Sequence, residues 1–236
     1  VATLPDDPDA LLALRDAEKS LLPKRGAYGS AIVDGSLWSN ALGRDVNYRV
    51  YTPDGYQTAG IFYPSVYLLH GLHGNEKSWT DDGDLKTLCD QYFDARPLEA
   101  RVLVVPDGGD LWYRDSKDES AKYETFFMTE LIPHIERNFR VLPDRENRAV
   151  AGFSMGGYGA LCYAMRRPDL FSVCYAMHAA AIPEEERARY IGLKGFMEPF
   201  LRDDGTIVED DYFREWDPVV LVERYAQKDK DAVRFF

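Results

Sequence analysis

The sequence is short of the features that mark several large classes of protein. Its 236 residues include only three cysteines, an odd number without regular spacing, which excludes a disulfide framework and predicts reduced, buried thiols at Cys89, Cys162 and Cys174. No apolar run approaches the roughly 20 residues that a membrane-spanning helix needs. The formal net charge is −12, and this acidic excess argues against nucleic acid or an anionic membrane as the main partner.

What remains fits a globular protein. The hydrophobic share of 45% and the aromatic share of 13% are enough to bury a substantial core in one domain. No signal peptide is visible, and because the chain begins with Val1 we expect that residues before it have been removed. The compartment (secreted, periplasmic or cytoplasmic) is undetermined, and so is the oligomeric state, with a homo-oligomer among the options.

Short apolar runs alternate with amphipathic stretches along most of the chain. After an N-terminal extension over residues 1–28, we expect strands at residues 30–37, 45–51, 66–69, 102–105, 148–152, 171–176 and 232–236. Helical spacing fills the gaps between the later strands, and Pro133 predicts a kink in one helix because its nitrogen cannot donate to Thr129. Residues 180–229 interrupt the alternation, and we expect an inserted lid or cap there. The order predicts an α/β domain over residues 29–236, with a mostly parallel sheet and helices on both faces.

One motif points to chemistry. Gly152-Phe-Ser-Met-Gly156 matches G-x-S-x-G, the nucleophile elbow of α/β-hydrolases. A sharp strand-to-helix turn needs small residues two positions before and after the serine, so that the turn does not collide with its neighbours. Chance alone produces this pattern in roughly one chain in ten of this length. Here it follows an apolar strand and opens an amphipathic helix, which favours Ser154 as a nucleophile over an incidental serine in a glycine-rich turn.

A second motif, His70-Gly-Leu-His-Gly74, follows the strand at residues 66–69. Acyl transfer builds negative charge on the carbonyl oxygen, and two backbone N–H groups can hold it. We predict that Leu72 and Met155 supply them, Met155 being the residue after the nucleophile. The alternative reading of His70 and His73 as metal ligands is disfavoured, because no cysteine or carboxylate cluster accompanies them. No metal and no organic cofactor are predicted.

The catalytic base is difficult to identify in this sequence. Hydrolases of this fold carry the acid and then the histidine after the serine, yet the only later histidine is His178 and the only acid before it is Asp169. Asp169 precedes a strand, whereas active sites lie at the carboxyl ends of strands, so this triad is disfavoured. His134 belongs to a helix stripe and is expected to be packed. A lost base, or His178 acting in its place, stays open, but because the chain stops on an apolar strand we expect the acid and the histidine beyond Phe236.

Taken together, the motifs resemble the esterase D-like family of α/β-hydrolases. That family includes S-formylglutathione hydrolases and bacterial feruloyl and acetyl esterases, with mycolyltransferases as more distant relatives. The resemblance covers about residues 40–180 and rests on the segments 42–51, 67–71, 105–109, 122–127, 130–136 and 151–160. It implies an α/β-hydrolase fold, a nucleophile at Ser154, and an oxyanion hole at Leu72 and Met155. His178 stands where relatives often carry a serine, and we expect it to face the site.

The sequence therefore predicts a serine carboxylic ester hydrolase that forms an acyl-enzyme on Ser154. The resemblance favours feruloyl or acetyl esters of plant carbohydrate, a small-molecule or carbohydrate-linked substrate, with an S-formylglutathione hydrolase as the enzymatic alternative. A candidate substrate pocket comprises Trp112, Tyr113, Tyr123 and His178, although the three aromatics fit core positions equally well. From another class, the absent base also allows a non-catalytic module that binds a carbohydrate or protein partner.

Overall fold

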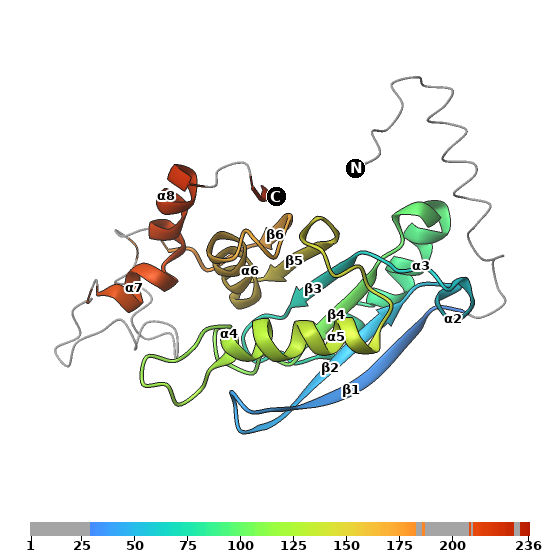
Figure 1. Ribbon diagram of the computed structural model, residues 1–236, viewed down its shortest axis with the longest axis horizontal. Helices are drawn as coiled ribbons and strands as arrows, with labels where there is room; N and C mark the ends of the chain where they lie inside the picture. Colours follow the sequence, from blue (N-terminus) through green and yellow to red (C-terminus); the bar gives the residue numbers. More distant parts are fainter. Residues whose placement is uncertain (1–28, 183–185, 187–207, 209, 229–231) are drawn as a thin grey trace, which may run out of the picture.

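Figure 1 shows the computed structural model of the chain, which describes residues 29–182, 186, 208, 210–228 and 232–236. The N-terminal extension predicted over residues 1–28 and about half of the predicted cap, residues 183–185, 187–207, 209 and 229, lie outside the described residues. Within the described ranges, no helix is both long and apolar enough to cross a bilayer.

A seven-stranded mixed sheet forms the centre of the domain, in the order β1-β2-β4-β3-β5-β6-β7. Its strands are β1 (Ala31–Ser39), β2 (Arg44–Thr52), β3 (Ser65–Leu69), β4 (Val102–Pro106), β5 (Arg148–Phe153), β6 (Val173–Met177) and β7 (Arg234–Phe235). The first two strands form an antiparallel hairpin that pairs antiparallel with β4, and the remaining strands run parallel. The predicted fold class is therefore confirmed, and all the predicted strands are present.

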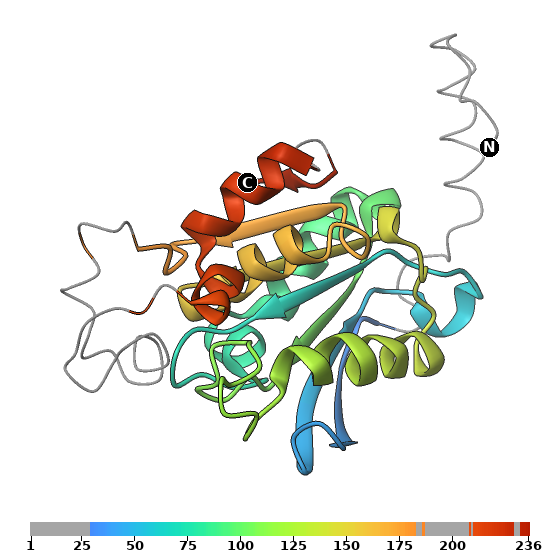
Figure 2. The same cartoon turned by 60° about the vertical axis from the view of Figure 1, so that its left-hand side comes forward.

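Helices cover both faces of this sheet (Figures 1 and 2). The helices are α2 (Tyr56–Ala59), α3 (Leu85–Ala95), α4 (Tyr123–Phe126), α5 (Ile132–Asn138), α6 (Met155–Arg166), α7 (Asp211–Trp216) and α8 (Pro218–Lys228). Two 3₁₀ turns, Pro97–Glu99 and Arg145–Asn147, and two π-helical turns, Ser78–Asp82 and Phe127–Leu131, complete the described structure. Helix α3 lies on the face opposite to α4, α5 and α6.

The irregularity predicted at Pro133 takes the form of a π-helical turn. The turn Phe127–Leu131 joins α4 to α5, and the N–H of Ile132 donates to the carbonyl of Phe127, five residues earlier. Pro133 follows at once, at the start of α5. Because proline has no N–H to donate to Thr129, the wider turn in front of it lets the helix continue as a second segment.

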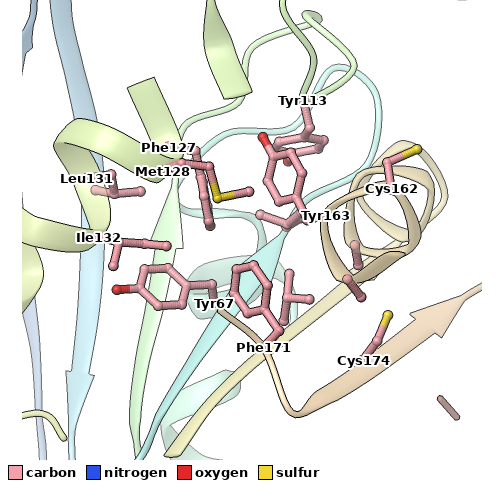
Figure 3. Close-up of a cluster of buried hydrophobic side chains, with 14 of the residues drawn as sticks. Tyr67, Tyr113, Phe127, Met128, Leu131, Ile132, Cys162, Tyr163, Phe171 and Cys174 are labelled. Atoms are coloured by element: carbon pink, nitrogen blue, oxygen red, sulfur yellow. The ribbon is translucent and has the colours of Figure 1, made fainter. Parts of the chain in front are cut away.

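The larger core lies between the sheet and the helices on the face of α6 (Figure 3). Tyr67 of β3 and Phe171, before β6, meet Phe127 and Tyr163 from the helices there, with ring centroids of Phe127 and Tyr163 4.8 Å apart. Cys162 and Cys174 are buried in this core as free thiols, as the sequence predicted. Cys89 of α3 is also a free thiol, but it is half-buried where the sequence predicted a buried side chain, because α3 covers the other face of the sheet with one side open to solvent.

Helices α7 and α8, the described part of the predicted cap, pack onto α6. The hydroxyl of Tyr158 donates to the carbonyl of Trp216 over 2.6 Å, and Phe213 and Leu221 are buried in the larger core. In the described region these helices therefore contribute to the helical layer that covers β5 and β6. Strand β7, the next described element, pairs parallel with β6 and so adds to the sheet.

Candidate active site

Ser154 occupies the bend between β5 and α6 in a strained backbone conformation. Its φ of 56° and ψ of −114° lie in a region that side chains with a Cβ rarely adopt. The Ser154 N–H donates to the carbonyl of Met177 over 2.9 Å, and its carbonyl accepts from the N–H of Tyr158 over 3.0 Å, so both flanks of the bend are fixed. The residue is half-exposed, and its hydroxyl has no hydrogen-bond partner among the described residues.

Two glycines allow the bend to close. A Cβ on Gly152 would lie 2.2 Å from the carbonyl oxygen of Gly156, and a Cβ on Gly156 would lie 2.1 Å from the carbonyl oxygen of Leu69. Real Cβ atoms do not approach backbone oxygens this closely, so no larger residue fits without a backbone shift. The glycines of the motif therefore bring the start of α6 against β5 and the end of β3, which places the helix N-terminus beside Ser154.

The loop after β3 lies directly against the nucleophile. A Cβ on Gly71 would lie 3.7 Å from the Cβ of Ser154, and the N–H of Gly74 donates to the carbonyl of Gly71 to close a turn over 3.0 Å. Within this turn the N–H of His73 binds Asp110, whereas the N–H of Leu72 has no acceptor among the described residues. Met155 opens α6, so its N–H has no partner within the helix. Both predicted oxyanion-hole amides thus lie at the bend without a competing acceptor.

His70 holds this loop in place. Its Nε2 accepts from the N–H of Gly108 over 2.8 Å, so its Nδ1 carries the proton and donates to the carbonyl of Gly71 over 2.7 Å. Both ring nitrogens are used, which leaves no lone pair for a metal ion. Burial lowers the pKa of His70 below its usual value, because it disfavours the imidazolium more than the bond to Gly71 and the nearby carboxylates of Asp107 and Asp110 favour it.

The lowered pKa of His70 predicts a loss of stability in mild acid. As the pH falls through about 6.5, His70 binds a proton in the unfolded state but not in the folded state. The contribution of His70 to the free energy of unfolding is therefore fully present above this pH and decreases below it. The expected decrease is at most about 1.4 kcal/mol per pH unit for this group. Urea denaturation at pH 7.5 and 5.5 measures it.

The control for this prediction is His134, whose pKa is also lowered by burial. The variant His134→Gln retains the contribution of His70 and should still lose stability in acid. The variant His70→Asn should be less stable than the wild type at pH 7.5 but should vary less with pH. Equal pH dependence in the wild type and His70→Asn contradicts the assignment.

The remaining histidines lie in three different settings. His134 on α5 shares a 2.7 Å hydrogen bond with the hydroxyl of Tyr48 on β2 and is packed away from Ser154, as expected. His178 follows β6 at the nucleophile edge, is exposed, and has its ring centroid 6.0 Å from that of Phe153. His73 pairs with Asp110. None of these rings hydrogen-bonds the Ser154 hydroxyl.

The triad Ser154–Asp169–His178 is not assembled. Asp169 precedes β6, while His178 follows it, so the two side chains stand at opposite ends of the strand. The Asp169 carboxylate instead accepts two bonds from Arg167, over 2.7 and 2.9 Å. This placement agrees with the expectation that Asp169 lies at the wrong edge of the sheet.

The three aromatic residues proposed for a substrate pocket are almost completely buried. Trp112, Tyr113 and Tyr123 are 2% exposed or less. The hydroxyl of Tyr113 donates to the carbonyl of His70 over 2.9 Å, and that of Tyr123 donates to the carbonyl of Asp107 over 3.0 Å. Their burial favours support of the two loops beside Ser154 over direct contact with a substrate. The exposed aromatic side chain beside the nucleophile is Phe153.

The pairing of His73 with Asp110 has no signal in the sequence. The two residues lie 37 positions apart, on the loops that follow β3 and β4. Because β3 and β4 are parallel neighbours, their carboxyl ends bring the two loops together. Only the strand order could have suggested the contact.

A cavity of about 260 Å³ lies elsewhere in the molecule. It is lined by Tyr51, Asp90 and Phe93, among others. Tyr51 pairs with Leu103 near the amino end of β4, whereas Ser154 follows the carboxyl end of β5. The cavity is therefore at the opposite edge of the sheet from the candidate site.

Comparisons with known proteins place this geometry in context. The profile of a family described as putative esterase matches residues 39–235. An esterase of Mycobacterium tuberculosis is 37% identical over 156 residues, which cover 59% of this chain and 32% of the relative. An endo-1,4-beta-xylanase/feruloyl esterase of Xylanibacter ruminicola is 32% identical over 143 residues, covering 58% of this chain and 20% of the relative. The chain thus matches about a third or less of the length of these relatives.

A solved structure of a ferulic acid esterase resembles the whole described domain. It superposes with a TM-score of 0.67 at 31% sequence identity, covering 87% of this chain and 74% of that one. The likeness confirms the α/β architecture predicted from the sequence.

Proposed function

The chain belongs to the putative esterase family, and from this membership we propose that it hydrolyses carboxylic esters through an acyl-enzyme on Ser154. One observation carries the proposal: a half-exposed serine in a strained bend faces a loop whose Leu72 amide has no acceptor among the described residues. Strain at a functional group persists only where the surroundings impose it, and here two glycines and two backbone hydrogen bonds do so.

The proposed reaction follows from this arrangement. The Ser154 hydroxyl attacks the carbonyl carbon of the ester while a base takes its proton, and the carbonyl oxygen becomes an oxyanion. The amides of Leu72 and Met155 donate to that oxyanion, and the N-terminus of α6 adds its positive end. As the intermediate collapses, the bond to the ester oxygen breaks and the protonated base gives its proton to that oxygen, so the alcohol leaves; water then attacks the acyl-enzyme, the base takes a proton from the water, and that proton returns to the Ser154 oxygen as the acid is released.

The base in this scheme is a histidine that the described residues do not present to Ser154. His70 and His134 are engaged elsewhere, His73 pairs with Asp110, and His178 makes no hydrogen bond to the nucleophile. We propose a histidine oriented by an acid for this role, because the imidazole takes the proton of a serine hydroxyl in the hydrolases that use this mechanism. Reactivity towards a fluorophosphonate tests this part of the proposal, because it requires a serine that a base activates, and its absence favours a non-catalytic binding module.

A fluorophosphonate probe tests the nucleophile. Incubated with the full-length gene product, the probe should attach covalently at Ser154, and peptide mass spectrometry should locate the adduct there. The heat-denatured protein is the control, because an isolated serine hydroxyl without its surroundings is a weak nucleophile. A native protein that stays unlabelled, or one labelled at another residue, contradicts the proposal.

For the substrate class, we propose feruloyl or acetyl esters of plant carbohydrate. The named activities of the ferulic acid esterase and the xylanase/feruloyl esterase support this choice. The exposed Phe153 ring beside Ser154 offers a surface for an aromatic acyl group.

A panel of substrates tests this choice. Methyl ferulate or an acetylated xylan oligosaccharide should have a kcat/KM value about tenfold or more above that of S-formylglutathione, because the contacts of a pocket discriminate between substrates that differ in their acyl and leaving groups. Steady-state kinetics on the same preparation measures the ratio. A preference for S-formylglutathione favours the alternative and leaves the serine mechanism unaffected.

A further inference from the structure

The loop after β3, which lies against Ser154, is joined to the loop after β4 by one side chain from each. The Asp110 carboxylate accepts from the backbone N–H of His73 over 2.8 Å with Oδ1, and its Oδ2 accepts from the Nδ1 of the same residue over 3.0 Å. We propose that Asp110 is a positioning residue: by holding the His73 backbone, it aims the Leu72 N–H at the oxyanion that forms on Ser154. This inference rests on the proposed ester hydrolysis and assigns a further residue to it.

The backbone of His73 needs such support. Its φ is 63°, in the left-handed region that disfavours residues with a Cβ. Without a bond to its N–H, the turn from Gly71 to Gly74 could relax to another geometry by rotating its central peptide groups. Asp110 binds both the N–H and the ring of His73, and so it fixes the peptide group that immediately follows Leu72.

Within this turn, the Leu72 N–H is the backbone donor that remains available to a substrate. Of the three N–H groups that follow Gly71, that of His73 binds Asp110 and that of Gly74 binds the carbonyl of Gly71. The Leu72 N–H has no acceptor within the described part of the chain. Gly71 itself lies against the nucleophile, so a rotation in this turn changes the direction of the Leu72 N–H at the reacting atoms.

Asp110 is presented by a loop that is itself held firmly. The N–H of Gly108 donates to His70, and the N–H of Gly109 donates to the Asp107 carboxylate over 2.9 Å. The carboxylate of Asp110 also remains ionised, since its pKa is lowered: partial burial raises it, but the backbone and ring hydrogen bonds from His73 outweigh that effect. An ionised acceptor on a fixed loop can hold the turn throughout the neutral range.

An ordinary surface ion pair is the competing explanation, because both side chains are largely exposed, 75% for His73 and 53% for Asp110. Exposed pairs contribute little to stability. The two explanations differ in what removal of the carboxylate changes. A surface pair affects at most the melting temperature, whereas a positioning residue affects the stabilisation of the oxyanion.

The test is Asp110→Ala in the full-length gene product, assayed with p-nitrophenyl acetate and normalised to fluorophosphonate-titrated active sites. We expect kcat to fall about tenfold with KM changed less than about twofold, a part of the loss expected when one oxyanion donor is removed entirely. The inhibition constant of a trifluoromethyl ketone, which forms an oxyanion on Ser154, should rise by the same factor. Asp110→Asn retains a side-chain oxygen that can accept from the His73 N–H, and it should restore most of kcat.

Asp169→Ala is the matched control, since it breaks an exposed aspartate–arginine pair at the other edge of the sheet and should leave all three constants unchanged. Unaltered kcat and inhibition constants in Asp110→Ala, with or without a lower melting temperature, overturn the positioning role alone. If the wild-type protein is not labelled by fluorophosphonate, the serine mechanism fails and the positioning role fails with it.

Discussion

Replacing Ser154 with alanine is expected to reduce kcat/KM for ester substrates by about 10⁴-fold or more, and to abolish fluorophosphonate labelling. The attacking hydroxyl is lost, while the two oxyanion-hole amides remain and account for any residual rate. The fold should persist, because the Ser154 hydroxyl makes no hydrogen bond within the described residues, and alanine keeps the same Cβ in the same bend. Steady-state kinetics together with circular dichroism measure the two effects.

Ser154→Gly is the matched variant. Glycine adopts a φ of 56° without the steric penalty of a Cβ, so this variant should lose activity equally and gain about 1 kcal/mol in the free energy of unfolding. A gain in stability upon loss of the nucleophile indicates that the strain serves the reaction. If Ser154→Ala retains more than a few per cent of the activity, another residue is the nucleophile.

Gly156→Ala is expected to have the largest effect on stability. The new Cβ would lie 2.1 Å from the carbonyl oxygen of Leu69 and 2.7 Å from that of His70, and these are backbone atoms in β3 and the loop that follows it. They cannot rotate away as a flexible side chain can, so either α6 moves off the sheet or β3 shifts. We expect a loss of about 3 kcal/mol or more, together with loss of activity, because both movements displace the oxyanion loop.

Urea denaturation measures this loss, and Gly29→Ala is its control. A Cβ on Gly29 has no atom within 4 Å, so that substitution should change the free energy of unfolding by less than about 1 kcal/mol. If Gly156→Ala is as stable as the wild type and equally active, then the close packing of the bend against β3 is not required for the site.

Much of the fold could be predicted from the sequence because its signals are local. Strands such as Val102–Pro106 are continuous apolar runs, and α6 begins within the G-x-S-x-G motif, directly after Ser154. Pro133 predicted an irregular helix because its missing N–H is a property of the residue itself. The π-helical form of that irregularity was not predicted, since it depends on how α4 and α5 pack on the sheet.

The residues of the candidate site also divide into those that local sequence predicts and those that it does not. Ser154, Leu72 and Met155 could be named from spacing, whereas Trp112, Tyr113 and Tyr123 could not be separated into pocket and core residues, because aromatic side chains serve both. Their burial is a property of the packed domain.

By itself, the sequence determined the succession of strands and helices along the chain and the bend at Ser154. These follow from hydrophobic periodicity and from the steric needs of a few adjacent residues. Tertiary structure alone decided which loops meet at that bend. The strand order places β4 beside β3, and so Asp110 reaches His73 in the loop that lies against the nucleophile. Contacts between residues 37 positions apart depend on the pairing of strands, which no local pattern encodes.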